Sequence, residues 1–174
     1  MIKKLILFLM LFIPIISYSN QKVRTDGKDI SYLYIQYAST AVLTPTNWAT
    51  GQYTLALKDF PPYVIYFSDR PNRVSGILCM RKFLKIWEQG KNDNFGKNPP
   101  NVSITGIRLH LLDKEKDEFF TVELSHPQYD EKKQLLLYDA TVLTADRKNM
   151  PQRESILRHV ILFVDGWCPS CCCG

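Results

Sequence analysis

Apolar and polar residues alternate along several short runs of the chain, and a period of two is typical of strands with one buried face. The first run starts near Ser31, where aromatic and β-branched residues recur through Tyr37. Six more runs follow, each next to turn-forming residues: 52–58, 62–68, 102–112, 118–125, 134–143 and 159–164. The pattern therefore predicts about seven β-strands with short connections.

One segment, residues 75–89, has the period of a helix instead. Its apolar positions fall on one helical face while its charged positions fall on the other; the apolar ones are Ile77, Met80, Phe83, Leu84 and Trp87. Ser75 is suited to cap the N-terminus of this helix and Gly90 its C-terminus. Residues 91–100 are polar and end in two prolines, so we expect them to form a surface loop.

About seven strands and one amphipathic helix predict a mainly β fold, either a β-sandwich or an open barrel with the helix packed on one end. We expect this domain to span residues 31–166. A polar segment over residues 20–30, expected to be flexible, precedes it, and a cysteine-rich tail over residues 167–174 follows it. A chain of 174 residues is long enough for one domain with its own hydrophobic core.

The first 19 residues contain the three regions of a secretory signal peptide in the right order. Two lysines are followed by an apolar run over residues 5–16 and by a small-x-small site that ends at Ser19. Spanning a bilayer takes about 20 apolar residues, whereas this run is shorter and contains Pro14. We therefore expect cleavage after Ser19 rather than retention as an anchor, and a periplasmic or secreted protein without a stable membrane span.

The formal net charge of the whole chain is +5, which is small and scattered, so the sequence does not indicate nucleic-acid binding. We expect the partner to be a ligand or another protein. Tyrosines concentrated in the first strands would form a platform for a sugar or peptide if they are exposed, or fill the core if they are buried: Tyr32, Tyr34, Tyr37, Tyr53, Tyr63 and Tyr66.

A charged loop lies between the predicted strand that ends at Ser68 and the predicted helix. Its arginines, Arg70 and Arg73, could bind a carboxylate or phosphate near the helix N-terminus, with Asp69 as part of the same anion site. Alternatively, Asp69 caps the turn and pairs with an arginine, which would fix the corner between strand and helix. The sequence leaves both interpretations open.

The same loop contains the string YFSDRP at residues 66–71, and further positions accompany it: Arg73, Gly76, Phe83, Trp87, Phe95, Pro100 and Asn101. On these residues the chain resembles a group of exported bacterial proteins without an assigned activity. The similarity extends over about residues 53–143. It implies an exported single domain and assigns no catalytic residue.

Four of the five cysteines crowd the last seven residues: Cys168, Cys171, Cys172 and Cys173. Their thiolates would suit copper(I) or zinc, although three adjacent cysteines fit a tetrahedral site poorly; no other cofactor is indicated. The alternative is a set of disulfides within or between chains in an oxidising compartment. The Trp-Cys-x-x-Cys order is also similar to the active site of thioredoxin-like proteins, but only three residues follow Cys171 here.

A hydrolase triad could in principle be drawn from Ser125, His126 and Asp130. Neighbours in a strand point to opposite faces, however, so we do not expect Ser125 and His126 to converge. His110 and Asp113 match a metal-ligand spacing only loosely. The sequence therefore predicts an exported, non-enzymatic binding or interaction module with a cysteine-rich tail. The alternative is a metal-handling or thiol-disulfide redox protein that acts through the tail cysteines.

Overall fold

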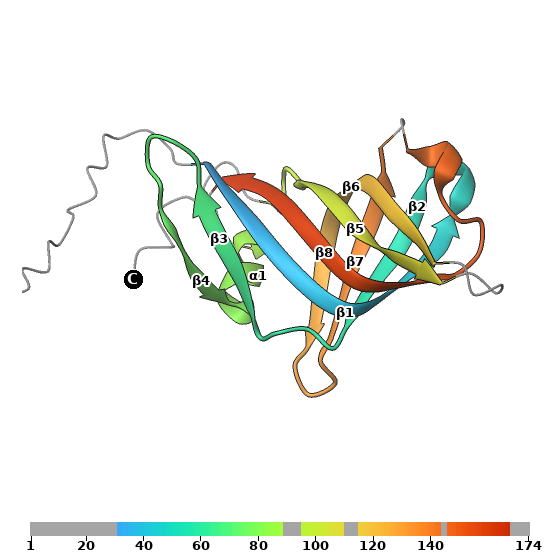
Figure 1. Ribbon diagram of the computed structural model, residues 1–174, viewed down its shortest axis with the longest axis horizontal. Coiled ribbons are helices and arrows are strands. Elements are labelled where there is room, and N and C mark those ends of the chain that lie inside the picture. Colours follow the sequence, from blue (N-terminus) through green and yellow to red (C-terminus); the bar gives the residue numbers. More distant parts are fainter. Residues whose placement is uncertain (1–30, 89–94, 110–114, 144–145, 168–174) are drawn as a thin grey trace, which may run out of the picture.

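The computed structural model describes residues 31–88, 95–109, 115–143 and 146–167 (Figure 1). The strands are β1 (Ser31–Asn47), β2 (Gln52–Lys58), β3 (Tyr63–Ser68), β4 (Ser75–Cys79), β5 (Asn101–Leu109), β6 (Glu115–Asp130), β7 (Leu135–Val142) and β8 (Ser155–Trp167). The helices are α1 (Met80–Glu88) and two 3-10 turns, η1 (Trp48–Thr50) and η2 (Arg147–Asn149). The predicted mainly β fold is thus confirmed. No helix within the described ranges is long and apolar enough to cross a membrane.

All eight strands belong to one antiparallel sheet with the order β2-β7-β6-β5-β8-β1-β3-β4. Because β2 also pairs with β1, six of the strands close into a barrel: β1, β2, β7, β6, β5 and β8. Strands β3 and β4 lie outside this ring and extend the sheet from the first half of β1. The structure is therefore a barrel with a two-stranded extension, which agrees with the predicted fold class.

Strand β1 makes this arrangement possible because its two halves pair with different neighbours. Residues 32–35 pair with β3, residues 40–47 pair with β2, and β8 runs along the other edge of both halves. Between the halves, the ladder of β1 and β8 skips Ser39 and His159, and His159 has a positive φ of 50°. The backbone N–H of Ser39 donates instead to the carbonyl of Asp59 at 3.1 Å. This break separates the barrel half of β1 from the extension half.

Side chains on the inner face of the sheet form the core. In β1 the buried positions have even numbers before the break, from Tyr32 to Ala38, and odd numbers after it, at Ala41 and Leu43. Three of the six tyrosines grouped by the sequence are buried in this core, namely Tyr32, Tyr34 and Tyr53, and Tyr66 is partly buried against it. Tyr37 and Tyr63 are exposed, so the six residues divide between the two expected environments.

Helix α1 closes the core on the side of β3, β4 and β6. Figure 1 shows it beside β3 and β4, at the end of the molecule away from the 3-10 turns. Its buried side chains are Met80, Phe83, Ile86 and Trp87. The Trp87 ring centre lies 4.8 Å from that of Phe95 and 5.7 Å from that of Tyr138. The predicted packing of one amphipathic helix against the sheet is therefore observed, and aromatic rings form its interface.

The helix begins later than the sequence pattern predicts. Residues 75–79 form β4, which pairs with β3 along its whole length, so the helix prediction is wrong for this segment and confirmed for residues 80–88. Ile77, which the pattern assigned to the buried helical face, is exposed on the sheet. The physical reason is that pairing with β3 outweighs the local helical period, because strand formation depends on a partner more than on local propensity.

Gly166 permits close packing near the end of β8. A Cβ atom added at this position would overlap the ring of Phe95, so glycine alone leaves room for that ring. Phe95 is itself buried against Trp87. The predicted surface loop over residues 91–100 is therefore anchored to the barrel by Phe95 in the part that the structure describes.

Two polar pairs lie in the interior. The Tyr138 hydroxyl donates to Oε1 of Gln36 at 3.2 Å, and Nε2 of Gln36 donates to the sulfur of Met80 at 3.6 Å. Near the end of β5, the guanidinium of Arg108 lies 3.2 Å from the carboxylate of Glu118 on β6. Removing one partner of a buried ion pair leaves an uncompensated charge. This pair therefore disfavours other registers of β5 against β6.

Burial in the core raises the pKa of Tyr138 well above its ordinary value of 10, and the hydrogen bond to Gln36 offsets this only in part. Burial also raises the pKa values of Tyr53 and Tyr129. Because the raised values belong to the folded state, the unfolded chain ionises first as the pH rises. Their contribution to stability is therefore complete below pH 10 and is lost progressively above it.

We predict that the free energy of unfolding falls above pH 10 by about 1.4 kcal/mol per pH unit for each tyrosine held neutral by the fold. The variant Tyr138→Phe should show a smaller slope, measured by urea unfolding between pH 9 and pH 11. The control is Tyr63→Phe, which changes an exposed tyrosine and should keep the wild-type slope. Equal slopes for wild type and Tyr138→Phe would contradict the prediction.

Candidate functional site

The charged loop of the sequence is the turn of the β3–β4 hairpin. Ser68 and Val74 close it, since the Ser68 N–H donates to the Val74 carbonyl at 2.7 Å and the Val74 N–H donates to Oγ of Ser68 at 2.8 Å. Oδ1 of Asp69 accepts the N–H of Arg70 at 2.6 Å, and the Asp69 carbonyl accepts the N–H of Arg73 at 3.2 Å. Asp69 therefore organises the turn, which is one of the two roles expected for it.

Arg70 and Arg73 are both exposed in this turn. Within the described residues neither forms an ion pair with Asp69, so the expected pairing with the aspartate is not observed. The whole of β4 separates the two arginines from the first residue of α1, and they are therefore not placed at a helix N-terminus. Binding of an anion at this turn stays a prediction, and it depends on the two guanidinium groups alone.

The predicted metal ligands Cys168, Cys171, Cys172 and Cys173 lie outside the described residues, as do His110 and Asp113. In the part of the chain that the structure describes, no three His, Cys, Asp or Glu side chains gather in a way that could hold a metal ion. Cys79 at the end of β4 is an exposed free thiol. The structure therefore leaves the tail untested and places one further thiol on the surface.

The histidine that was considered for a hydrolase has a different partner. Nδ1 of His126 lies 3.1 Å from Oδ2 of Asp139 on β7, and both side chains are exposed. Asp130 accepts the N–H of Lys133 at 3.1 Å instead. The ladder of β6 and β7 is irregular between Ser125 and Gln128, where His126 has a positive φ of 48°. Ser125, His126 and Asp130 are therefore not assembled into a triad.

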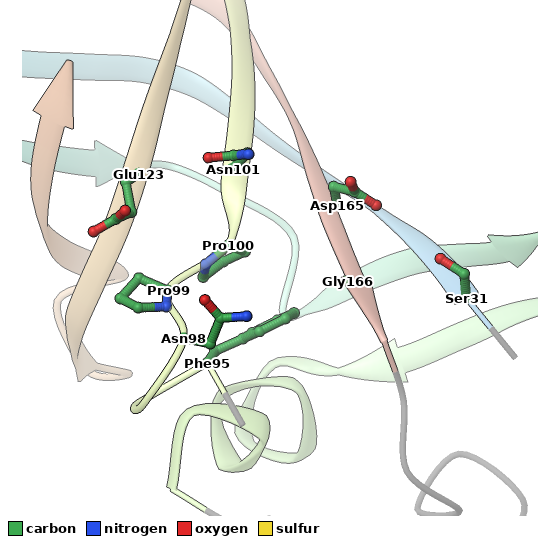
Figure 2. A pocket seen from close by; sticks show the side chains of 9 residues that line it. All are labelled: Ser31, Phe95, Asn98, Pro99, Pro100, Asn101, Glu123, Asp165 and Gly166. Carbon is green, nitrogen blue, oxygen red and sulfur yellow. The ribbon is translucent and has the colours of Figure 1, made fainter. Parts of the chain in front are cut away.

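A polar groove with a volume of about 480 Å³ lies between the segment before β5 and the outer side of the barrel (Figure 2). Its lining residues are Ser31, Phe95, Asn98, Pro99, Pro100, Asn101, Glu123, Asp165 and Gly166. Figure 2 shows the carboxylates of Glu123 and Asp165 directed to opposite sides of Asn101. They do not converge as an acid-base pair or a cation site would require. Sequence reasoning missed this groove because its two walls are far apart in the chain.

A second surface is made of exposed and partly buried apolar side chains on the outer side of β1, β3, β4 and β8. The register places Ile77, Ile65, Ile35 and Phe163 in one row across these four strands. On either side of this row lie further apolar residues of the same strands: Leu33, Tyr37, Tyr63, Phe67 and Ile161. We call these nine residues the apolar face. Helix α1 covers the opposite side of β3 and β4, and no other described element covers the apolar face.

The apolar face ends at β4, whose far edge is unpaired among the described strands. The Met80 N–H donates to the Pro62 carbonyl, and the Ser68 N–H donates to the Val74 carbonyl. Even-numbered residues of this segment thus bond to β3, and the backbone groups of alternate residues in an antiparallel strand point to opposite edges. Ser75, Ile77 and Cys79 therefore direct their N–H and C=O groups toward the free edge.

Comparison with known proteins adds no family to this description. No protein-family model, curated protein or solved structure matches the chain. The resemblance of the YFSDRP string to exported bacterial proteins accordingly stays a prediction. The candidate site is the apolar face with the β4 edge, and it rests on geometry alone.

We predict that Asp69 stabilises the hairpin turn more than the two arginines do. The variant Asp69→Ala loses a hydrogen bond to the backbone and should reduce the free energy of unfolding by about 1 kcal/mol. The double variant Arg70→Gln with Arg73→Gln changes exposed side chains only, and should stay within about 0.5 kcal/mol of wild type. Urea unfolding at neutral pH measures both, and a greater loss for the arginine variant would contradict the prediction.

Proposed function

We propose that this chain is an exported, non-enzymatic module that binds another protein through the apolar face. The observation that carries the proposal is the exposure of large apolar side chains in one continuous area: Ile77 is 68% exposed, Ile65 46% and Tyr63 42%. The largest exposed apolar patch of a protein is often functional, and larger patches mark interaction sites. Aromatic residues such as Tyr63 and Phe67 are also typical of protein interfaces.

The arrangement of the polar groups supports binding rather than catalysis. Catalytic groups need to converge on one position in a cleft. His126 and Asp139 form an exposed pair on the outer surface, whereas Arg108 and Glu118 are engaged with each other in the interior. Neither pair belongs to the apolar face. The nine residues of the face include no carboxylate, imidazole or thiol, and the polar groups at its border, Ser75, Cys79 and Asp165, are spread over β4 and β8.

The N-terminal residues bear on the compartment in which the apolar face would act. The first 19 residues have the order of regions typical of a secretory signal peptide, and we propose that the domain acts in the periplasm or outside the cell. There it would meet other exported proteins. The small net charge of the chain, +5, agrees with a protein or ligand as the partner rather than a nucleic acid.

We predict that a photo-crosslinking amino acid at Ile65 or Ile77 captures one and the same protein in the cell. Both positions lie in the central row of the apolar face, so a single docked partner would contact both. The cross-linked peptides are identified by mass spectrometry. The control position is Trp48, which is exposed in η1, outside the apolar face, and should give no such adduct. Equal adducts from all three positions, or none from the face, would contradict the proposed function.

A second candidate function, metal capture or thiol-disulfide exchange by the tail, is favoured by four cysteines within seven residues. Soft thiolates close together bind copper(I) or zinc. We predict that protein purified from the periplasm contains either bound copper or zinc or fewer than four free thiols in residues 168–174. Thiol titration and elemental analysis measure this, with all four tail cysteines changed to Ser as the control. A fully reduced, metal-free tail would contradict both uses.

A further inference from the structure

The free edge of β4 is open to another strand. Ser75, Ile77 and Cys79 direct their backbone groups away from β3, which leaves a short ladder without a partner among the described residues. Proteins commonly protect such edges with a proline, a charged side chain or a bulge. Residues 75–79 contain neither proline nor a charged residue. Backbone hydrogen bonds are therefore available to an incoming extended segment.

A strand added at this edge would also lengthen the apolar face. Ile77 is the outermost member of the row that continues through Ile65 and Ile35. An added strand places a side chain of its own beside Ile77, on the same side of the sheet. Pairs of apolar side chains on adjacent strands stabilise the pairing of those strands. The edge and the apolar face therefore favour the same kind of segment, one with apolar residues at every second position.

Positive charges flank β4 at both ends. Arg70 and Arg73 lie in the turn before it, and Arg81 and Lys82 follow it in the first turn of α1. Arg81 forms an ion pair with Glu131, whereas the other three cations form none within the described residues. Asp69 offsets one of the two arginines in the turn and Glu131 offsets Arg81, so one positive charge remains in excess at each end of β4. Acidic residues at the two ends of a segment along β4 would therefore be attracted and basic residues repelled.

The same charges argue against a second copy of this chain as the occupant. The antiparallel register that pairs all three open residues of two β4 strands is centred on Ile77. In that register the turn before β4 of one copy, which contains Arg73, comes to the end of β4 where α1 of the other copy begins with Met80, Arg81 and Lys82. Like charges brought together in an interface are unfavourable. A foreign segment with acidic ends fits the edge better.

The neighbouring segments of the chain are also poor candidates for this edge. Residues 20–30 contain Val23 and Ile30 in an otherwise polar and charged sequence, and four of the seven residues in 168–174 are cysteines. Neither segment has apolar residues at every second position, which the row through Ile77 would require. The occupant is therefore expected to come from another protein.

We propose that β4 is extended by a strand of another exported protein, in which apolar and polar residues alternate and acidic residues lie at both ends. This inference rests on the proposed function and names the chemistry of the partner. With roughly 200 Å² for each large apolar side chain, the five most exposed residues of the face leave about 500 Å² open. A standard interface buries about 800 Å² per partner, so the face and the β4 backbone together approach the area that a stable complex needs.

The experiment uses the full chain and a fluorescein-labelled peptide in which valine and threonine alternate between two pairs of glutamates. Fluorescence anisotropy at low ionic strength should show at least tenfold tighter binding than for the same peptide ending in lysines. Methylation of the backbone nitrogens on one edge of the peptide should weaken binding at least tenfold, since it removes the donors to β4. The double variant Arg70→Glu with Arg73→Glu should reduce the preference for glutamate ends.

The variant Ile77→Pro removes one backbone donor at the free edge while the bonds of Gly76 and Leu78 to β3 remain. It should weaken binding of the glutamate peptide at least tenfold, whereas Trp48→Ser should not change it. If Ile77→Pro does not fold, the methylated peptide makes the same test on wild-type protein.

Absence of binding, equal binding of the methylated peptide, or equal affinity for the two charge versions would overturn the inference. So would a dimer seen by sedimentation at micromolar concentration and abolished by Ile77→Pro, because a second copy would then occupy the edge. If the crosslinks at Ile65 and Ile77 persist while the peptide tests fail, the proposed function stands and strand addition is wrong. If the crosslinks are absent as well, both proposals fail.

Discussion

The irregular pairing of β1 with β8 at Ser39 and His159 is the constraint on which the architecture depends. Side chains alternate strictly along a strand, so a skipped residue moves the buried set from even to odd positions. Both strands change at the same place. Strand β1 buries even-numbered residues such as Tyr34 before the break and odd-numbered ones such as Leu43 after it, while β8 buries Leu157 before the break and Val160 after it. Each strand therefore keeps an apolar side toward the core on both sides of the break. The hydrogen bond from Ser39 to Asp59 supports the break from the β2–β3 connection.

The same break explains why a large apolar surface is left open. Beyond Ser39 the second half of β1 pairs with β2 and closes the barrel, while the first half pairs with β3 and carries the extension. Helix α1 covers one side of that extension. The other side has no second layer among the described residues, yet it presents Ile35, Ile65 and Ile77 in one row. Burial of apolar surface contributes about 25 cal/mol of free energy per Å². A partner that covers this side would therefore gain substantial binding free energy.

The sequence predicts the strands best where one side of each is polar. The run over residues 52–58 is a strand with the predicted bounds, because its alternation marks one buried side. The continuation of β1 to Asn47 was missed, since Pro45 and several threonines interrupt the pattern. The sequence pattern assigned residues 75–79 to the helix, because local periodicity carries no information about their pairing with β3. The role of Asp69 in the turn was among the expected alternatives, whereas the apolar face depends on the register of strands far apart in the chain.

The surroundings of β4 show how an open edge can be selective. A short apolar edge without internal charge would pair readily with another copy of itself, which is the usual route to aggregation. The positive charges at the two ends of β4, from Arg73 before the strand and Lys82 after it, disfavour that pairing, because a twofold arrangement brings the two ends together. A segment with acidic ends meets attraction at the same two places. Charges placed beside the strand, and not within it, thus discourage self-association while the backbone groups of Ile77 and its neighbours stay available to a partner of opposite charge.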